Sequence, residues 1–516
     1  MTANRVNWWE SHDAHQGLAG QKPAEGLLSH LKIWHVLALA LLLRGMLPVA
    51  GYYYTGDIGI FYNPDTHTYV EPARELITNH RFFANGAPEI IRTPGYPLLL
   101  TLGLLSGHLV ATTVLLQILL SCFTVYMVYR AALLVFEHER AAVAAAALYA
   151  IEPLSIFYTS QLLTETVFAA LTIVWIYYFL RYVKQQALRH LIVSAIALAA
   201  SIYVRPVAEY LPLILAIALS VWALLRRKPA RARILVHAIC FLLVSSALIL
   251  PWSARNFVET GYSQFAGISS INKYFYLAAS VSAAQGDLNF FEVQKQLGYM
   301  DDEAYLRRHP EQGSWTQGEK LEYLDKAAND ILARNRLTYL KIHLSGIARV
   351  MLDPGATPVL EFFDLYRMGG GLFGRILDEG PLKAISQNAV GHPAVFWSNL
   401  ALLPLLLLDI WCALLVIVSP SRRRDACVIA LSLTAAYFVM ISGGPAGLGR
   451  FRHPVMPIVC VLAGYGLMAG REERHRRRHA GNRSSSAKSS RAADHAGSSG
   501  APRNRGFAAA VSVIVP

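Results

Sequence analysis

Five arginines, each with a proline close by in the sequence, are the first candidates for chemistry in this chain of 516 residues. Proline ends a helix and leaves backbone groups unsatisfied, so each arginine is expected where a helix opens into a cavity. A guanidinium group keeps its charge and presents a planar fork of donors that suits phosphate. If the five lie together they form a site for an anion; alternatively, they reach lipid headgroups or pair with nearby glutamates. The five are Arg92, Arg205, Arg255, Arg450 and Arg452.

Acidic residues form the second candidate group. Asp57 and Asp65 lie in one polar segment, and Asp65 precedes residues at helical spacing, where an aspartate would cap the N-terminus of the helix. Glu165 lies near the end of a long apolar run. An ionisable residue at the end of a membrane span is a functional candidate, and its alternative role is a salt bridge to one of the arginines.

The chain around these residues has the composition of an integral membrane protein. Hydrophobic residues make up 54% of it and charged residues only 16%, whereas about a quarter of the residues in soluble chains are charged. Apolar runs of about 20 residues recur, which is the length of helix that crosses a bilayer. The five cysteines lie in such runs without CxxC spacing, so a disulfide framework or a zinc site is not expected.

The apolar runs predict an all-α polytopic fold with about ten transmembrane helices and two outward-facing loop regions. Lysine and arginine concentrate in alternate short loops, on the side of the N-terminus, and the positive-inside rule makes this side cytoplasmic. The net charge of +13 is placed by membrane orientation, and binding of nucleic acid is not expected. The predicted spans are 33–52, 97–130, 139–157, 162–181, 190–207, 209–225, 232–252, 394–418, 426–443 and 454–470.

These spans divide the chain into five regions. Both termini are expected in the cytoplasm, and the candidate arginines and carboxylates are expected on the outer side. The regions are a cytoplasmic N-terminal segment 1–32, an N-terminal transmembrane module 33–252 with a first outer loop 53–94, a periplasmic region 253–393 with short interfacial helices, a C-terminal transmembrane module 394–470, and a basic tail 471–516 that is predicted to be disordered.

Five segments, in their order and spacing, carry a resemblance to a known family. They are Pro64-Asp65-Thr66-His67-Thr68-Tyr69 with the following Arg92-Thr93-Pro94-Gly95-Tyr96-Pro97, then Leu162-Leu163-Thr164-Glu165-Thr166, Val204-Arg205-Pro206, Pro251-Trp252-Ser253-Ala254-Arg255-Asn256, and Arg450-Phe451-Arg452-His453-Pro454. Together they resemble the GT-C superfamily of membrane glycosyltransferases. The chain looks most like the bacterial group related to protein O-mannosyltransferases (the dolichyl-phosphate-mannose-protein mannosyltransferase type) and to the lipid A aminoarabinose transferase, over residues 35–470.

The resemblance implies a hexosyl- or pentosyltransferase that takes its sugar from a polyprenyl-phosphate carrier. It matches the catalytic aspartate of the first outer loop to Asp65, which would act as general base toward the acceptor hydroxyl. Many relatives have a second acid beside this aspartate, whereas Thr66 stands here, and Asp57 is the remaining candidate for that role. Glu165 would orient an arginine or a sugar hydroxyl. Some relatives bind a divalent metal ion, for which Asp57 and Asp65 are the candidate ligands.

The arginines would stabilise the phosphate leaving group, with Arg255 and Arg450 or Arg452 as first candidates and Arg92 and Arg205 as further ones. Direct displacement would invert the anomeric centre. The resemblance also implies a bacterial inner membrane with the site facing the periplasm, and an acceptor that is a glycolipid, a polysaccharide or a protein. The last residues, Ala510 to Pro516, resemble the first strand of a GT-A-type glycosyltransferase, so the tail is a candidate linker to a fused domain.

Two other classes of function stay open. A transporter or flippase of lipid-linked sugars also has membrane charges and broken helices, but here the charges gather at the outer face and no inverted repeat is evident. A surface-polysaccharide ligase or polymerase would share the fold and use diphosphate-linked oligosaccharides. The combination of Asp65 and Glu165 favours the enzyme that uses a monophosphate-linked sugar.

Overall fold

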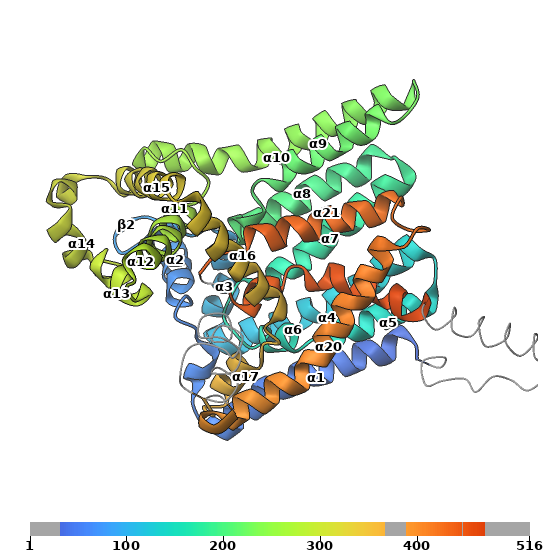
Figure 1. Cartoon of the computed structure of the whole chain (residues 1–516), viewed down its shortest axis with the longest axis horizontal. Coiled ribbons are helices and arrows are strands. Elements are labelled where there is room, and N and C mark those ends of the chain that lie inside the picture. Colours follow the sequence, from blue (N-terminus) through green and yellow to red (C-terminus); the bar gives the residue numbers. More distant parts are fainter. Residues whose placement is uncertain (1–30, 367–388, 446, 470–516) are drawn as a thin grey trace, which may run out of the picture.

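The computed structural model describes residues 31–366, 389–445 and 447–469. In these ranges, long helices form a bundle, and shorter helices gather at one end of it (Figure 1). Nearly all of the predicted N-terminal segment, the predicted tail with its strand-like end, and residues 367–388 of the predicted periplasmic region lie outside the described residues.

Six described helices are long and apolar enough to cross a membrane, and four shorter apolar helices accompany them. The six are Ile33–Thr55 (α1), Leu109–Phe136 (α4), Glu165–Gln185 (α7), Pro206–Leu224 with η3 (Pro206–Ala208) and α9 (Leu211–Leu224), Ala230–Thr260 (α10) and Pro393–Val418 (α20). The four are Gly95–Leu105 (α3), Leu188–Val204 (α8), Ala426–Ile441 (α21) and Met456–Ala469. The predicted all-α polytopic membrane fold is confirmed.

Two of the predicted spans are each broken into two helices. Between α3 and α4 the chain turns at Gly107, whose φ of +72° is a left-handed conformation that glycine adopts without strain. The span predicted at 139–157 contains α5 (Glu139–Ala150) and the short α6 (Pro153–Phe157). Proline at the start of a helix lacks only an N–H that would have no partner there, so Pro153 favours a new helix at this point.

The centre of the bundle is α7, because 72% of its most apolar stretch is buried inside the protein. It packs between α4 and α8, and α5 packs on α4. The last helix approaches α5 closely, since a Cβ atom added at Gly464 would lie 2.5 Å from the backbone nitrogen of Ala145. The first residue of α7 is Glu165, so the central helix brings a carboxylate into the middle of the protein.

Arg44 of α1 is fully buried and ties α1 to the end of α5. Its guanidinium donates to the carbonyl oxygens of Ala150 (2.8 Å) and Tyr149 (3.2 Å) and to the hydroxyls of Ser121 and Ser155. The last carbonyls of a helix lack partners within it. Arg44 therefore satisfies groups that the break between α5 and α6 leaves open.

The first outer loop contains η2 (Ile58–Phe61), α2 (His67–Thr78) and a hairpin of β1 (Phe83–Ala84) and β2 (Ala87–Pro88). The strands pair in antiparallel register, Phe83 with Pro88 and Ala84 with Ala87. Asn85 and Gly86 between them both have positive φ, as a tight hairpin turn requires.

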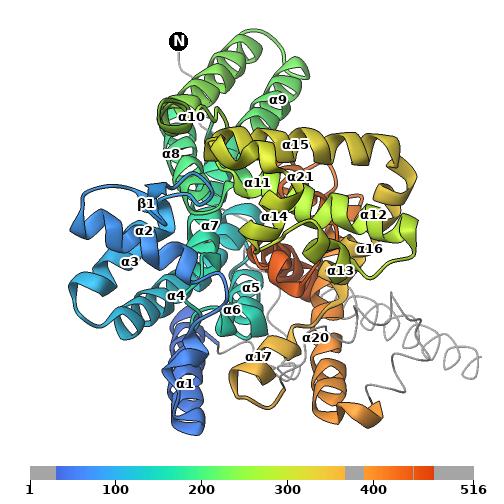
Figure 2. The same cartoon turned by 90° about the vertical axis from the view of Figure 1, so that its left-hand side faces the viewer.

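The second outer region is a set of short helices that lies over one end of the bundle, beside α2 (Figure 2). It has its own aromatic core, in which Tyr262, Tyr274, Phe275 and Tyr305 pack with Leu321. Its elements are α11 (Ile268–Asn272), the π-helical turn η4 (Lys273–Ala278), α12 (Ala279–Gly286), α13 (Phe290–Gln296), α14 (Asp302–Arg308), η5 (Pro310–Ser314), α15 (Gln317–Arg334), α16 (Arg336–Leu352) and α17 (Ala356–Phe362). The 3-10 turn η6 (Gly449–Arg452), which precedes the last helix, packs against α16.

Candidate functional site

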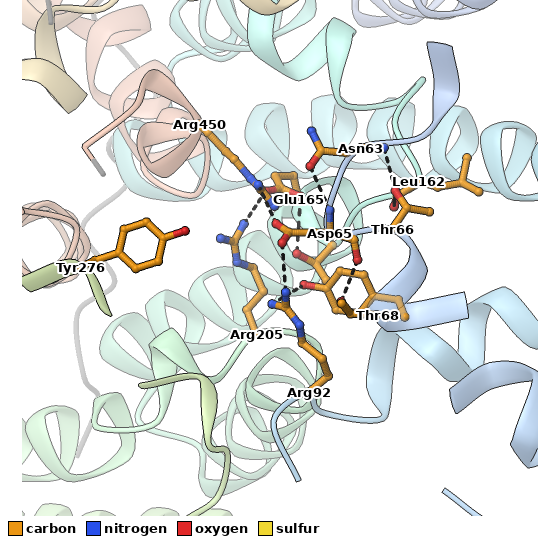
Figure 3. A network of polar contacts seen from close by, with 12 residues as sticks. Asn63, Asp65, Thr66, Thr68, Arg92, Leu162, Glu165, Arg205, Tyr276 and Arg450 are labelled. Atoms are coloured by element: carbon orange, nitrogen blue, oxygen red, sulfur yellow. Dashed lines mark hydrogen bonds and ion pairs between the residues drawn. The ribbon is translucent and has the colours of Figure 1, made fainter. Parts of the chain in front are cut away.

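Two carboxylates and three guanidinium groups, drawn from distant parts of the sequence, form one network of ion pairs (Figure 3). Asp65 accepts hydrogen bonds from Arg92 and from Arg450, each at 3.0 Å. Glu165 accepts from Arg205 at 2.8 Å and from the Nε of Arg450. Arg450 is therefore shared by the two carboxylates and joins the two halves of the network.

Asp65 is held by the turn that precedes α2. The Thr66 hydroxyl donates to the carbonyl of Leu162 at 3.0 Å and accepts from the backbone N–H of Asn63, and Thr68 donates to the Asp65 carbonyl. The prediction that Asp65 caps α2 is wrong, because Thr66 is the capping residue and both carboxylate oxygens of Asp65 face arginines. The charge of the arginines attracts the carboxylate more strongly than a neutral backbone N–H would.

The three arginines come from breaks in the helices. Arg205 ends α8 directly before Pro206, and Arg450 lies in η6 four residues before Pro454. Arg92 follows the hairpin and lies over the Tyr69 ring, with its guanidinium 4.8 Å from the ring centre and a 3.2 Å hydrogen bond to the Tyr69 hydroxyl. The network therefore forms at one end of the bundle, where Arg205 ends α8 and where Arg92 and Arg450 lie in the segments before α3 and before the last helix.

The charges of the network do not balance. Three guanidinium groups and two carboxylates leave a net charge of +1. Burial raises the pKa of Asp65, but the charges of Arg450 and Arg92 outweigh it, so this pKa lies below its usual value. Burial alone would lower the pKa of Arg450, but Glu165 and Asp65 outweigh it and raise this pKa. Both shifts favour the charged forms of Asp65 and Arg450. The Nε of Arg92 is buried without a partner among the described residues.

The structure places Arg255 and Arg452 outside this network. Arg255 donates to the carbonyls of Phe82 (2.9 Å) and Glu89 (2.7 Å) and so holds the hairpin; Pro251 does not end the helix before it, since α10 continues to Thr260. Arg452 is buried and donates to the carbonyls of Val350 and Asp353, each at 2.7 Å. In this conformation both arginines satisfy backbone carbonyls at the outer end of the bundle.

Asp57 is also separate from the network. Its carboxylate accepts from the backbone N–H of Gly59 at 2.7 Å and borders a cavity beside Arg450. Within the described ranges there is no group of three or more His, Cys, Asp or Glu side chains that could hold a metal ion. Because both oxygens of Asp65 bind guanidinium groups, the pair of Asp57 and Asp65 does not fit a divalent cation here.

Two residues that the sequence analysis did not select stand close to the network. The Asp353 carboxylate accepts from the backbone N–H of Gly449 at 3.1 Å and so positions the turn that carries Arg450. Tyr276 points its hydroxyl toward the network in Figure 3 and is hydrogen-bonded to the hydroxyl of Tyr299 at 2.6 Å. It lies in η4, and π-helical turns occur frequently at functional sites.

Comparisons with known proteins bear on the family and on the fold. Residues 92–252 match the model of the dolichyl-phosphate-mannose-protein mannosyltransferase family. The fold is similar to that of the archaeal oligosaccharyltransferase AglB from Archaeoglobus fulgidus in complex with an inhibitory peptide and a dolichol-phosphate. The TM-score is 0.50 at 15% identity, over 87% of this chain and 51% of that chain. The predicted resemblance to the GT-C superfamily is confirmed.

Two further structures of the Archaeoglobus fulgidus oligosaccharyltransferase give TM-scores of 0.47, for a complex with Zn and sulfate, and 0.48, for the apo form. Their identities are 16% and 15%, and the matches cover 86% and 87% of this chain and 50% and 52% of those chains. The chain thus spans about half the length of the proteins whose structures it resembles. The comparison with curated proteins gave no match.

The burial of Glu165 leads to a prediction about stability. In Glu165→Gln, Arg205 and Arg450 lose a counter-charge inside the protein, and breaking a buried pair in this way costs about 3 kcal/mol. We expect a clearly lower thermal unfolding temperature of the purified protein in detergent. The matched control is Glu137→Gln, which removes an exposed partner of Lys184 and should leave the unfolding temperature unchanged. Equal effects of the two substitutions would contradict this account of Glu165.

Proposed function

We propose that this protein is a membrane glycosyltransferase that transfers a sugar from a polyprenyl-phosphate carrier to an acceptor at the outer face of the membrane. The observation that carries the proposal is the network of Asp65, Glu165 and three arginines with its net charge of +1. The family match over residues 92–252 and the fold shared with an oligosaccharyltransferase support it.

The three arginines bind the phosphate of the donor. A polyprenyl-phosphate sugar is a phosphodiester with one negative charge, which matches the net charge of the network. Arg92 has a buried Nε without a partner among the described residues, and guanidinium groups form paired hydrogen bonds to phosphate oxygens. As the bond to the sugar breaks, a second negative charge develops on the phosphate. Fixed cations stabilise that charge more in the transition state than in the ground state.

Asp65 acts as the general base, and the donor prepares it for this role. A carboxylate paired with two guanidinium groups holds a proton weakly. It is therefore a poor base until an anion competes for the two guanidinium groups. When the phosphate draws Arg92 and Arg450 toward itself, the pKa of Asp65 rises toward its ordinary value. Asp65 then takes the proton of the acceptor hydroxyl as its oxygen bonds to the anomeric carbon. The bond from that carbon to the phosphate oxygen breaks, and its electron pair leaves with the polyprenyl phosphate.

Glu165 is a positioning residue in this mechanism. It is fully buried and bonds to Arg205 and Arg450. It therefore keeps these two guanidinium groups in place while Asp65 exchanges its partners. Tyr276 faces the same space and supplies a further hydroxyl to the donor. Direct displacement inverts the anomeric centre. No step is assigned to a metal ion, because the carboxylates of the network already bind guanidinium groups.

A donor with a single phosphate fits better than the two alternative functions. A diphosphate-linked donor of a polysaccharide ligase brings more negative charge than the +1 of the network offsets. A flippase must pass its cargo through the membrane, whereas the network lies at helix ends on one side of the bundle. By the positive-inside rule this side is the periplasmic face of a bacterial inner membrane, with both termini in the cytoplasm. The fused GT-A domain stays a prediction from residues outside the described ranges.

The general-base role predicts the effect of Asp65→Asn. Transfer from a radiolabelled polyprenyl-phosphate sugar in membranes should fall by at least about a hundredfold, because an amide cannot accept the proton. Binding of polyprenyl phosphate should be retained or tightened, because the net charge of the network rises from +1 to +2. Unchanged transfer at normal protein level would contradict the role, and Asp57→Asn would then be the next variant to assay. Loss of both transfer and binding would also contradict it.

The lowered pKa of Asp65 predicts a pH effect. The profile of kcat/KM reports the free enzyme, so its acid limb should lie below the ordinary aspartate pKa of about 4. Arg92→Gln removes one of the two cations beside Asp65, which raises the pKa of Asp65. The acid limb should therefore move to higher pH. Arg255→Gln, which removes an arginine outside the network, should leave the limb in place. An acid limb that does not move in Arg92→Gln would contradict the assignment of Asp65.

A further inference from the structure

A cavity of about 920 Å³ lies beside Arg450 at the outer end of the bundle. Its wall is formed by the end of α1, by η2 and the segment up to Pro64, and by α6, α17 and η6. Pro64 precedes Asp65, and Arg450 of the wall is paired with Asp65, whose own side chain is not in the wall, so the cavity borders the network at Arg450. Of the described residues, Arg92, Arg205 and Tyr276 are not in this wall, and they face the network from elsewhere.

The charge of the cavity is opposite to that of the network. Besides Asp364, three carboxylates of described residues border it, and the described guanidinium in its wall, that of Arg450, is already paired with Asp65 and Glu165. Among them, Glu361 is exposed and its side chain has no hydrogen bond or ion pair to any described residue. A phosphate or carboxylate entering this cavity would be repelled, and like charges in one site discriminate strongly between ligands. The three are Asp57, Asp353 and Glu361.

The remaining wall suits a compound with hydroxyl groups and apolar faces. Aromatic rings dominate it, and rings bind flat apolar surfaces and cations. Thr357 is 8% exposed, and its hydroxyl is buried without a hydrogen-bond partner among the described residues. A few polar groups among aromatic side chains are typical of binding pockets. The rings are Tyr54, Tyr62, Phe157, Tyr158, Phe362 and Phe363.

We propose that this cavity binds the acceptor, and that the portion of the acceptor bound there is a neutral or cationic polyhydroxyl compound without phosphate or carboxylate groups. This assignment rests on the proposed function and names its second substrate class. Direct displacement requires the acceptor and the leaving phosphate to lie on opposite sides of the anomeric carbon. Arg450 separates two such sides. The acidic cavity provides the side of the acceptor, and the side of the phosphate is provided by Arg92, Arg205 and Tyr276, which lie away from the cavity.

The test uses the full chain in membranes with a radiolabelled decaprenyl-phosphate sugar. Three probes share the hexyl group and the glucose ring and differ in the charged substituent of the sugar: hexyl glucoside is neutral, hexyl glucosaminide is cationic and hexyl glucuronide is anionic. Each is added as a competitor of transfer to the membrane acceptors. We expect the neutral and cationic probes to inhibit at concentrations at least about fivefold lower than the glucuronide, as roughly 1 kcal/mol of charge repulsion predicts.

The variant Glu361→Lys tests whether the preference for neutral and cationic probes over the glucuronide arises in the cavity. Because Glu361 is exposed and its side chain has no described partner, the fold should tolerate the change. The difference between the glucoside and the glucuronide should shrink to about twofold or less, while the Kd of decaprenyl phosphate stays the same. The matched control is Asp330→Lys, a charge reversal at an exposed position of α15, which should change neither quantity.

Three results would overturn the inference and leave the proposed function standing. The first is inhibition by the glucuronide at concentrations as low as those of the glucoside, and the second is transfer that none of the three probes inhibits. The third is a change in the Kd of decaprenyl phosphate in Glu361→Lys. The last result would mean that the cavity holds the donor. A wild-type chain that transfers no sugar from any polyprenyl-phosphate donor would overturn the proposed function itself, and the acceptor assignment with it.

Discussion

The sharing of Arg450 between Asp65 and Glu165 is the interaction on which the rest of the site depends. It joins a loop between the first spans, the start of the central helix α7 and the turn before the last helix. Each of these pieces is fixed by contacts of its own. Thr66 ties the first loop to the carbonyl of Leu162, and Asp353 ties the turn η6 to the end of α16. The fold therefore holds a network that is partly buried and carries a net charge of +1.

The imbalance of charge explains how one site can serve two substrates. A net charge of +1 attracts a phosphodiester, and the arrival of that anion loosens the pairs that keep Asp65 a weak base. In the proposed mechanism, activation of the base is thereby coupled to the presence of the donor, which limits proton transfer in the empty enzyme. In the proposed arrangement, the carboxylates around the neighbouring cavity exclude a second anion, so the donor phosphate and the acceptor occupy different sides of Arg450 according to their charge.

Much of this could be predicted from the sequence, for identifiable reasons. Apolar runs predict spans because the bilayer permits only helices that satisfy their own backbone. Proline beside arginine correctly indicated that Arg205 lies where a helix stops, whereas Arg450 lies in the 3-10 turn before the last helix. The same pattern could not tell whether a guanidinium meets a carboxylate or a carbonyl, which is why Arg255 and Arg452 were grouped with the others. That choice depends on tertiary neighbours, Phe82 and Glu89 for Arg255 and Val350 for Arg452.

Other features have no sequence signature. The position of Tyr276 is set by one wide helical turn, and the role of Asp353 depends on a loop 96 residues away along the chain. The most direct measurement of the central claim is a structure of the full chain with bound polyprenyl phosphate. The account predicts the phosphate on Arg450 together with Arg92 or Arg205, and an Asp65 carboxylate with at least one oxygen released from its arginine. A phosphate in the acidic cavity, or an Asp65 still bonded to both arginines beside a bound phosphate, would contradict it.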